Sequence, residues 1–185
     1  VSGTFNMIHP DVRMRHEGLH KLEVIAGACA RLGTRVVTLC TGTRDAENMW
    51  RGHADNASPE AWRDLHVSLT KALTIANKHD LTLGIEPETS NVIGSAAKAR
   101  RLLDEMKSPR LKIIIDPANL LHPRDLPRQR EVLEDAFDRL GGDLVLAHAK
   151  EIAPDGHPGG LAIGAGVLDW DLYLGPAAWR PFNRK

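Results

Sequence analysis

The chain has 185 residues, 42% of them hydrophobic, and its 24 basic and 24 acidic residues give a net charge of zero. This length suits one domain, or most of one larger domain. The charge balance argues against a nucleic-acid partner bound through a basic surface. No apolar stretch approaches the ~20 residues needed to cross a bilayer, and the N-terminal segment lacks the features of a secretory signal. We therefore expect a globular, cytoplasmic protein without a membrane partner.

The chain has two cysteines, Cys29 and Cys40. Cys29 lies on an apolar helical face, and Cys40 lies near the end of a predicted strand. In a chain without a secretory signal, two such residues are expected to be reduced and buried as small apolar side chains.

The spacing of apolar residues predicts strands and helices that alternate along the chain. Short apolar or β-branched runs indicate strands, and residues at helical spacing indicate helices. Ser58 and Pro59 are typical of a helix start, and Asp169 is expected near another N-cap. The predicted elements in chain order are a partial strand at 1–8, helix 12–32, strand 36–40, helix 59–78, strand 81–85, helix 96–106, strand 111–115, an irregular loop at 117–123, helix 130–140, strand 144–147 and a helix beginning near 169.

This alternation predicts a parallel sheet with right-handed crossovers, of about five strands. A doubly wound sheet and a (β/α)8 barrel both begin this way. No Gly-x-Gly-x-x-Gly turn follows an early strand, and polar residues end several strands in succession, which favours the barrel. A complete barrel needs about 250 residues. We therefore predict a partial (β/α)8 TIM barrel at 1–174, without its first strands and last strand, and an atypical tail at 175–185.

Three apolar runs each end in a residue that can bind a metal ion. The runs at 81–85, 111–115 and 144–147 are followed by Glu86, Asp116 and His148. Neighbouring strands lie ~4.8 Å apart, so inward side chains can converge on one ion. Two carboxylates and one imidazole suit Mn²⁺, Mg²⁺, Co²⁺, Fe²⁺ or Zn²⁺, and three ligands leave room for substrate. Each acid alone could instead cap the next helix, and a lone histidine could be a core residue.

Five further residues are candidates for substrate binding. For these residues the alternatives are structural: a solvated charge, the cap of a turn, or a residue in the segment that leads into a helix. Trp50 and Trp62 are expected to pack rather than to stack on a ligand. The candidates are Lys150 on the strand face of His148, Asn119 three residues after Asp116, Glu88 beside Glu86, His9 (with Asn6) at the end of the first strand, and Arg44 as a clamp for phosphate or carboxylate.

Five motifs, in this order and spacing, carry a resemblance that extends to about Leu174. They are Asn-Met-Ile-His-Pro-Asp, Gly-Ile-Glu-Pro-Glu, Ile-Asp-Pro-Ala-Asn, Ala-His-Ala-Lys-Glu and Gly-Ala-Gly-Val-Leu-Asp-Trp. The chain resembles the xylose isomerase-like TIM-barrel superfamily, and within it the sugar phosphate isomerase/epimerase branch.

The resemblance implies a divalent metal held by Glu, Asp, His and a further Glu, the first three being Glu86, Asp116 and His148. It also implies that the metal polarises the carbonyl and hydroxyl oxygens of the substrate. Two glutamates, of which Glu86 is one, then move a proton beside the carbonyl through an enediolate. Two departures stand out: Asn119 replaces a histidine of many relatives, and the last strand with its glutamate is missing.

The leading hypothesis is a metal-dependent isomerase or epimerase of a sugar or sugar phosphate, whose activity in this chain the missing glutamate puts in question. A metal-dependent abasic-site endonuclease or a polyol dehydratase of the same superfamily is the second hypothesis. The third is a non-catalytic, truncated barrel that serves as a binding module. Its two open sheet edges would favour homo-oligomers.

Overall fold

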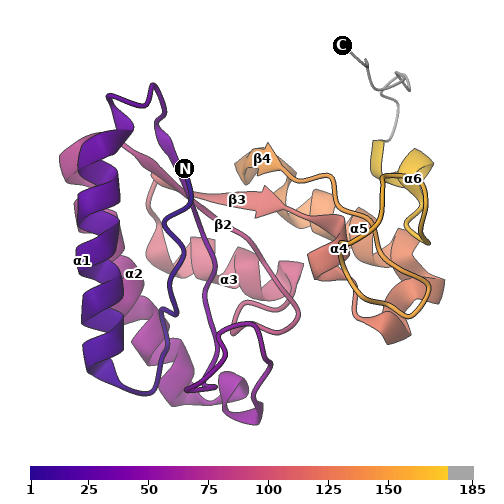
Figure 1. Ribbon diagram of the computed structural model, residues 1–185, viewed down its shortest axis with the longest axis horizontal. Coiled ribbons are helices and arrows are strands. Elements are labelled where there is room, and N and C mark those ends of the chain that lie inside the picture. Colours follow the sequence, from indigo (N-terminus) through magenta and orange to yellow (C-terminus); the bar gives the residue numbers. More distant parts are fainter. Residues whose placement is uncertain (175–185) are drawn as a thin grey trace.

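Four apolar segments form one parallel sheet in the computed structural model, which describes residues 1–174. The strands cross the middle of the molecule (Figure 1). Neighbouring strands follow one another along the chain, and every adjacent pair is parallel. A doubly wound sheet would reverse this order at a switch point, whereas a barrel does not. In sheet order, the strands are β1 (Val36–Leu39), β2 (Thr82–Ile85), β3 (Leu111–Ile115) and β4 (Leu144–Ala147).

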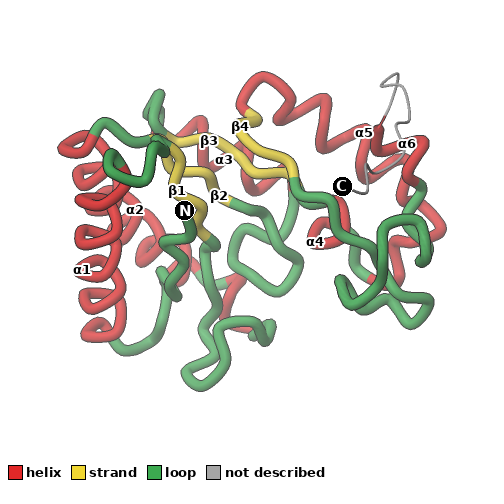
Figure 2. Tube along the Cα trace, turned by 45° about the horizontal axis from the view of Figure 1, so that its top comes forward, coloured by secondary structure: helices red, strands yellow, loops and turns green. Residues whose placement is uncertain are grey.

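Helices lie around the strands, with α1 and α2 at one end of the row and α5 at the other (Figure 2). Pairs of helices also contact each other, α1 with α2 and α3 with α5. The helices are α1 (Val12–Cys29), α2 (Pro59–His79), α3 (Ala96–Met106), α4 (Pro117–Leu120), α5 (Gln129–Leu140) and α6 (Trp170–Leu174), with 3₁₀ turns η1 (Ala54–Ala57), η2 (Pro123–Arg128) and η3 (Gly141–Asp143).

Side-chain caps fix where two of the helices begin. Ser58 Oγ accepts a hydrogen bond of 3.1 Å from the backbone N–H of Ala61, and Pro59 is the first residue of α2. Asp169 Oδ1 accepts a hydrogen bond of 2.9 Å from the backbone N–H of Leu172 in α6. Both caps satisfy N–H groups that have no partner inside the helix. The two predicted helix starts are confirmed.

One predicted helix end and one predicted loop differ from the structure, each for a local reason. Helix α1 ends at Cys29 rather than at Leu32, because a tighter turn follows, in which Leu32 N bonds to Cys29 O and Gly33 N bonds to Ala30 O. The segment after Asp116, predicted as an irregular loop, begins with the short helix α4. Asp116 Oδ1 caps it by accepting a hydrogen bond of 3.0 Å from the backbone N–H of Ala118.

The N-terminal segment does not form a full strand, so residues 1–174 contain four strands where about five were predicted. Ser2 pairs with Thr38 of β1 in an isolated parallel bridge. Further along, the side chain of Asn6 bonds to the backbone of Thr43, where a strand would use its own backbone. Its Oδ1 accepts a hydrogen bond of 3.1 Å from Thr43 N, and its Nδ2 donates one of 2.8 Å to Thr43 O. Asn6 therefore holds the loop that follows β1, rather than extending the sheet.

The strands and the inner faces of the helices form one main apolar core, which includes the fully buried Leu65, Leu83 and Ile113. Cys29 and Cys40 are both free and buried, as predicted. Within residues 1–174, none of the helices has both the length and the apolar character that a membrane span requires.

Candidate metal centre

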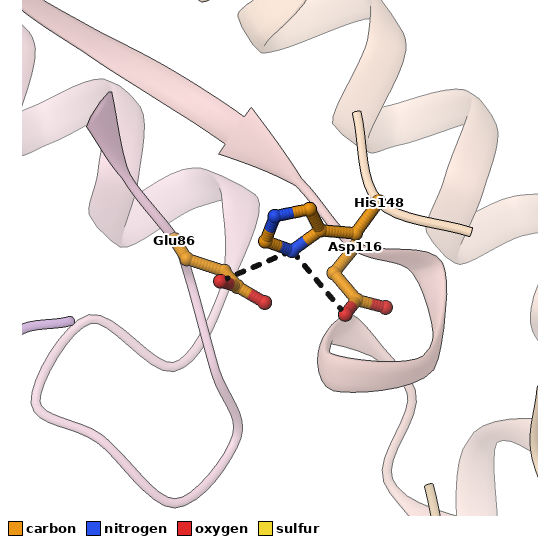
Figure 3. Close-up of side chains that lie close together, drawn as sticks. All are labelled: Glu86, Asp116 and His148. Atoms are coloured by element: carbon orange, nitrogen blue, oxygen red, sulfur yellow. Dashed lines mark ion pairs between the residues drawn. The ribbon is translucent and has the colours of Figure 1, made fainter. Parts of the chain in front are cut away.

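The three residues predicted to bind a metal follow three adjacent strands. Backbone pairing continues one residue beyond β2 and β4. The N–H of Glu86 donates a hydrogen bond of 3.0 Å to Leu39 O, and the N–H of His148 donates one of 2.8 Å to Ile115 O. The backbone of Asp116 is fixed differently, because this residue caps α4. These constraints bring the three side chains together (Figure 3).

The imidazole of His148 lies between the two carboxylates (Figure 3). Its Nδ1 is 3.3 Å from Glu86 Oε2 and 3.8 Å from Asp116 Oδ2. One potential ligand atom from each residue lies within 4.8 Å of the other two. The exposed fraction of the side chain falls from 37% for His148 to 17% for Glu86 and 0% for Asp116. The cluster, here called the triad, is therefore open at His148 and closed at Asp116.

Asp116 uses its two carboxylate oxygens differently. Oδ1 caps α4, whereas Oδ2 is buried and accepts no hydrogen bond from any described residue. Lys150 Nζ lies 2.7 Å from Oδ2, but this ion pair lacks the alignment of a hydrogen bond. A carboxylate oxygen can accept two bonds, so this buried oxygen has room for a further partner. A divalent cation shared with Glu86 and His148 would provide it, and two carboxylates with one imidazole are a suitable donor set. The triad therefore fits a divalent metal ion.

Two of the predicted substrate-binding residues contact the triad directly. Asn119 Nδ2 donates a hydrogen bond of 2.5 Å to Glu86 Oε1. Asn119 Oδ1 in turn accepts a hydrogen bond of 3.0 Å from Lys150 Nζ. Because Lys150 also pairs with Asp116, a chain of polar contacts joins the two carboxylates of the triad. Asn119 and Lys150 are placed to orient these carboxylates as well as to meet a ligand.

A further carboxylate, Glu88, lies beside the triad. It accepts a hydrogen bond of 3.1 Å from Asn91 Nδ2. Burial raises the pKa of Glu88, and the neighbouring charge of Glu86 raises it further. Burial is also the main cause of the raised pKa of Glu86, which positive charge on His148 opposes and Asp116 reinforces. Both carboxyl groups therefore bind a proton more tightly in the metal-free chain than exposed glutamates do.

His9 makes its contacts in the loop that follows β1, and these contacts include no triad residue. Its Nε2 lies 3.1 Å from Ala46 O, and its Nδ1 accepts a hydrogen bond of 3.0 Å from the backbone N–H of Asp11. These bonds join the start of α1 to the loop. They give His9 a structural role, and its predicted contact with substrate stays a prediction.

Arg44 is likewise engaged in structural contacts. Its Nη1 donates a hydrogen bond of 2.9 Å to Ile8 O, and its Nη2 lies 2.8 Å from Asp64 Oδ2. Asp64 also pairs with Arg15, at 3.2 Å from Nη2 to Oδ1. The two guanidinium groups are largely buried, with 11% and 12% of their side chains exposed. Arg44 therefore connects the loop after β1 to α2, and its role as a clamp for phosphate or carboxylate stays a prediction.

The sequence analysis gave no role to Glu151, which is 1% exposed and fully hydrogen-bonded. Its Oε1 accepts hydrogen bonds of 2.9 Å from Ile152 N and 3.0 Å from Leu168 N. Its Oε2 accepts bonds of 2.8 Å from Gly164 N and 2.6 Å from Trp170 Nε1. Its sequence signal was its place in the Ala-His-Ala-Lys-Glu motif, directly before a Gly/Pro-rich segment that needs an anchor.

The strand order and the triad at the strand ends both point to one family. A sequence profile described as the xylose isomerase-like TIM barrel matches residues 1–176. The chain belongs to the xylose isomerase-like TIM-barrel family. The predicted family is thus confirmed. A comparison with curated protein sequences found no significant match.

Solved structures support the same fold. A 3-keto-D-glucoside 4-epimerase from E. coli is 21% identical, with a TM-score of 0.66 over 91% of this chain and 61% of that chain. A D-allulose 3-epimerase from Methylomonas sp., in complex with D-allulose, is 13% identical, with a TM-score of 0.67 over 91% of this chain and 54% of that one. A xylose isomerase-like TIM barrel protein from Mycobacterium smegmatis, in complex with magnesium, is 14% identical, with a TM-score of 0.62 over 86% of this chain and 56% of that one.

These identities establish the likeness of fold alone. The chain spans between 54% and 61% of the length of the three structures. With four parallel strands in sequential order, this coverage confirms the prediction of a partial barrel. The predicted tail at 175–185 lies outside the described residues.

Proposed function

We propose that the chain carries the metal-binding part of a sugar isomerase or epimerase. The observation that supports this most strongly is the convergence of Glu86, Asp116 and His148, with the buried Asp116 Oδ2 lacking a hydrogen bond. The membership of the family and the sugar epimerases among the structural neighbours agree with it. A divalent ion held by the triad would supply a Lewis acid for the oxygens of the substrate.

Glu86 is the residue proposed to move the proton. Its carboxylate would take a proton from the carbon beside the substrate's carbonyl, and the electron pair of the broken C–H bond would remain as an enediolate. Return of the proton by Glu86 to the former carbonyl carbon, with transfer of the hydroxyl proton between the two oxygens, would give an isomer. An epimer would require a second acid on the opposite face of the same carbon. Partial burial raises the pKa of Glu86 in the metal-free chain, and the charge of a bound divalent ion would oppose this effect.

Asn119 and Lys150 are proposed to support this step. The hydrogen bond from Asn119 Nδ2 fixes Glu86 Oε1, and Lys150 fixes the other end of the same amide. A base held in one orientation needs no reorganisation during proton transfer. The Lys150 ammonium also balances part of the negative charge of Asp116.

The proposal is tested by exchange of a substrate proton with solvent, which requires removal of the proton but no formation of product. The 185-residue chain is incubated with Mg²⁺ in D₂O, with D-fructose, D-tagatose or D-allulose and with their 6-phosphates. We expect NMR spectra to show loss of the proton beside the carbonyl for at least one sugar. The exchange should stop when Mg²⁺ is chelated and in the variant Glu86→Gln. A folded, metal-binding chain that exchanges no proton of any of these sugars would overturn the proposal.

A further inference from the structure

A cavity of about 520 Å³ adjoins the triad, with Glu88 and Asn119 in its wall. Small-molecule sites commonly enclose roughly 300–1,000 Å³. Asn119 connects the cavity to the triad, because its side chain also contacts Glu86. A ligand in the cavity would thus meet Asn119, a side chain that itself contacts the proposed base.

The wall of the cavity is polar, and among the described residues its basic side chains are the imidazoles of His122 and His157. Hydroxyl groups of Thr89 and Ser90 and the carboxylate of Glu88 can form hydrogen bonds with a ligand, whereas the amide of Asn119 already bonds to Glu86 and Lys150. Among the described residues that line it, none is a lysine or an arginine. Phosphate groups are usually bound by arginine, lysine or the N-terminus of a long helix. This wall instead suits hydroxyl groups, and its carboxylate would repel a phosphate dianion.

Trp50 is the large aromatic residue of this wall, and 56% of it is exposed. It lies in the loop between β1 and α2, where the sequence analysis expected packing. Exposed apolar surface beside a cavity is typical of a binding site. Sugars present C–H groups on one face of the ring or chain, and an indole can cover such a face. The exposed indole of Trp50 could therefore cover the C–H face of a sugar bound in the cavity.

A second wall comes from the segment anchored by Glu151. His157 and Pro158 line the cavity, and Ile152 pairs with Pro158 in an antiparallel bridge. The backbone N–H of Ala153 also donates a hydrogen bond of 2.9 Å to His157 O. Because the buried Glu151 carboxylate fixes both ends of this segment, the second wall is formed before a ligand binds.

We propose that this cavity binds a neutral, non-phosphorylated sugar, and that the Trp50 indole covers its apolar face. The inference rests on the proposed function and narrows its substrate class. The alternative is a sugar phosphate whose phosphate reaches a neighbouring cavity, which shares Thr89 and His122 and contains Arg124 and Arg128. That cavity is also lined by Asp125, Glu131 and Asp135, and Arg128 pairs with Glu131 at 2.7 Å. The N-terminus of α3 also lines that cavity, but its three carboxylates outnumber its two guanidinium groups and do not favour a phosphate.

The test is a fluorescence titration of the full chain in Mg²⁺ with matched pairs of ligands. D-Fructose, D-tagatose and D-allulose are each compared with their 6-phosphates. We expect at least one neutral ketose to quench the tryptophan emission saturably, with a Kd about tenfold or more below that of its phosphate. The variant Trp50→Phe should lose most of the quenching and bind about fivefold more weakly or worse. The variant Trp62→Phe, on α2 and outside this cavity, is the matched control and should behave as wild type.

Tighter binding of the phosphates, no saturable binding of any neutral ketose, or an unchanged Kd in Trp50→Phe would each overturn the inference. These failures are distinct from failure of the proposed function. Glu86-dependent proton exchange of a phosphorylated ketose alone would uphold the function and overturn the neutral substrate. Saturable binding of a neutral ketose without any proton exchange would uphold the neutral ligand and overturn the proposed function.

Discussion

Asn119 donates a hydrogen bond of 2.5 Å from Nδ2 to Oε1 of Glu86, the carboxylate proposed to move the proton. The same amide accepts a bond from Lys150, so its orientation is fixed from both sides. Many members of the resembled superfamily have a histidine where this chain has Asn119. An amide supplies both a donor and an acceptor, so Asn119 can bond to Glu86 and to Lys150 at the same time.

Replacement of Asn119 by alanine should slow proton exchange while leaving the triad intact. Loss of a residue that orients a metal ligand commonly costs 10–100-fold in activity or metal affinity. We expect a decrease of about tenfold in the metal-dependent exchange rate, measured by NMR at saturating Mg²⁺. Asn119→His should recover part of the rate, because an imidazole can donate the same hydrogen bond. An unchanged rate in Asn119→Ala would show that this contact does not orient Glu86.

Asp64 should contribute to stability and not to ligand binding. It pairs with the largely buried Arg15 and Arg44, so Asp64→Asn leaves two guanidinium groups with a neutral partner. We expect the free energy of unfolding in urea to fall by about 1.5–3 kcal/mol. Asp104→Asn, at an exposed i,i+4 pair on α3, is the control and should cost less than about 1 kcal/mol. If Arg44 clamped a substrate, Asp64→Asn would instead change the affinity for sugars.

The buried carboxylate of Glu151 should make stability depend on pH. Burial by itself raises the pKa of Glu151, but hydrogen bonds from Trp170, Ile152, Leu168 and Gly164 outweigh burial and lower the pKa below its ordinary value of 4.5. A lowered pKa in the folded state stabilises the protein above the unfolded pKa, and this stability is lost as the pH falls through the folded pKa.

Glu151→Gln tests this directly, since the amide N–H₂ would face N–H donors. We expect a loss of about 2–3 kcal/mol at pH 7, measured by urea unfolding, because donors are left without an acceptor. Below the folded pKa of Glu151 the difference from wild type should shrink, because the wild-type carboxyl is then protonated too. Glu134→Gln, at an exposed pair on α5, should show neither effect. A difference that stays constant with pH would contradict the role of the charge.

Cys40 should be chemically inert in the folded protein. Burial raises the pKa of its thiol to about 12, and the carboxylate of Glu88 adds to this effect. Because the thiolate is the reactive form, a disulfide reagent at pH 8 should not label Cys40 until the chain unfolds. Mass spectrometry of labelled peptides, with urea-unfolded protein as the reference, measures this. Rapid labelling of Cys40 in the native state would show that the end of β1 is open to solvent.

The sequence predicted the alternation of elements and the triad well, because both follow from local patterns. A run of apolar residues that ends in Glu86, Asp116 or His148 is visible without any tertiary information. The partners of long polar side chains are not visible in this way. Arg44 was expected at the site because its loop is polar, yet it reaches Asp64 on α2, 20 residues further along the chain.

The role of Glu151 could not be predicted from the sequence either. Three of its four donors lie 13–19 residues further along the chain, in a segment without regular apolar spacing. Similarly, the exposure of Trp50 depends on which loops pack against it, and no local pattern records that. Side chains that follow a regular strand are predictable, whereas those that organise irregular segments need the structure.

The binding of a divalent ion by the triad is the central claim, and isothermal titration of the full chain with Mn²⁺ tests it most directly. Wild type should bind one equivalent, and Glu86→Gln, Asp116→Asn and His148→Ala should each bind more than about tenfold more weakly, a loss of at least about 1.4 kcal/mol. Glu88→Gln, which removes a neighbouring carboxylate outside the triad, should stay within a few-fold of wild type. Equal Mn²⁺ affinity in wild type and the three triad variants, each shown to be folded, would contradict the account.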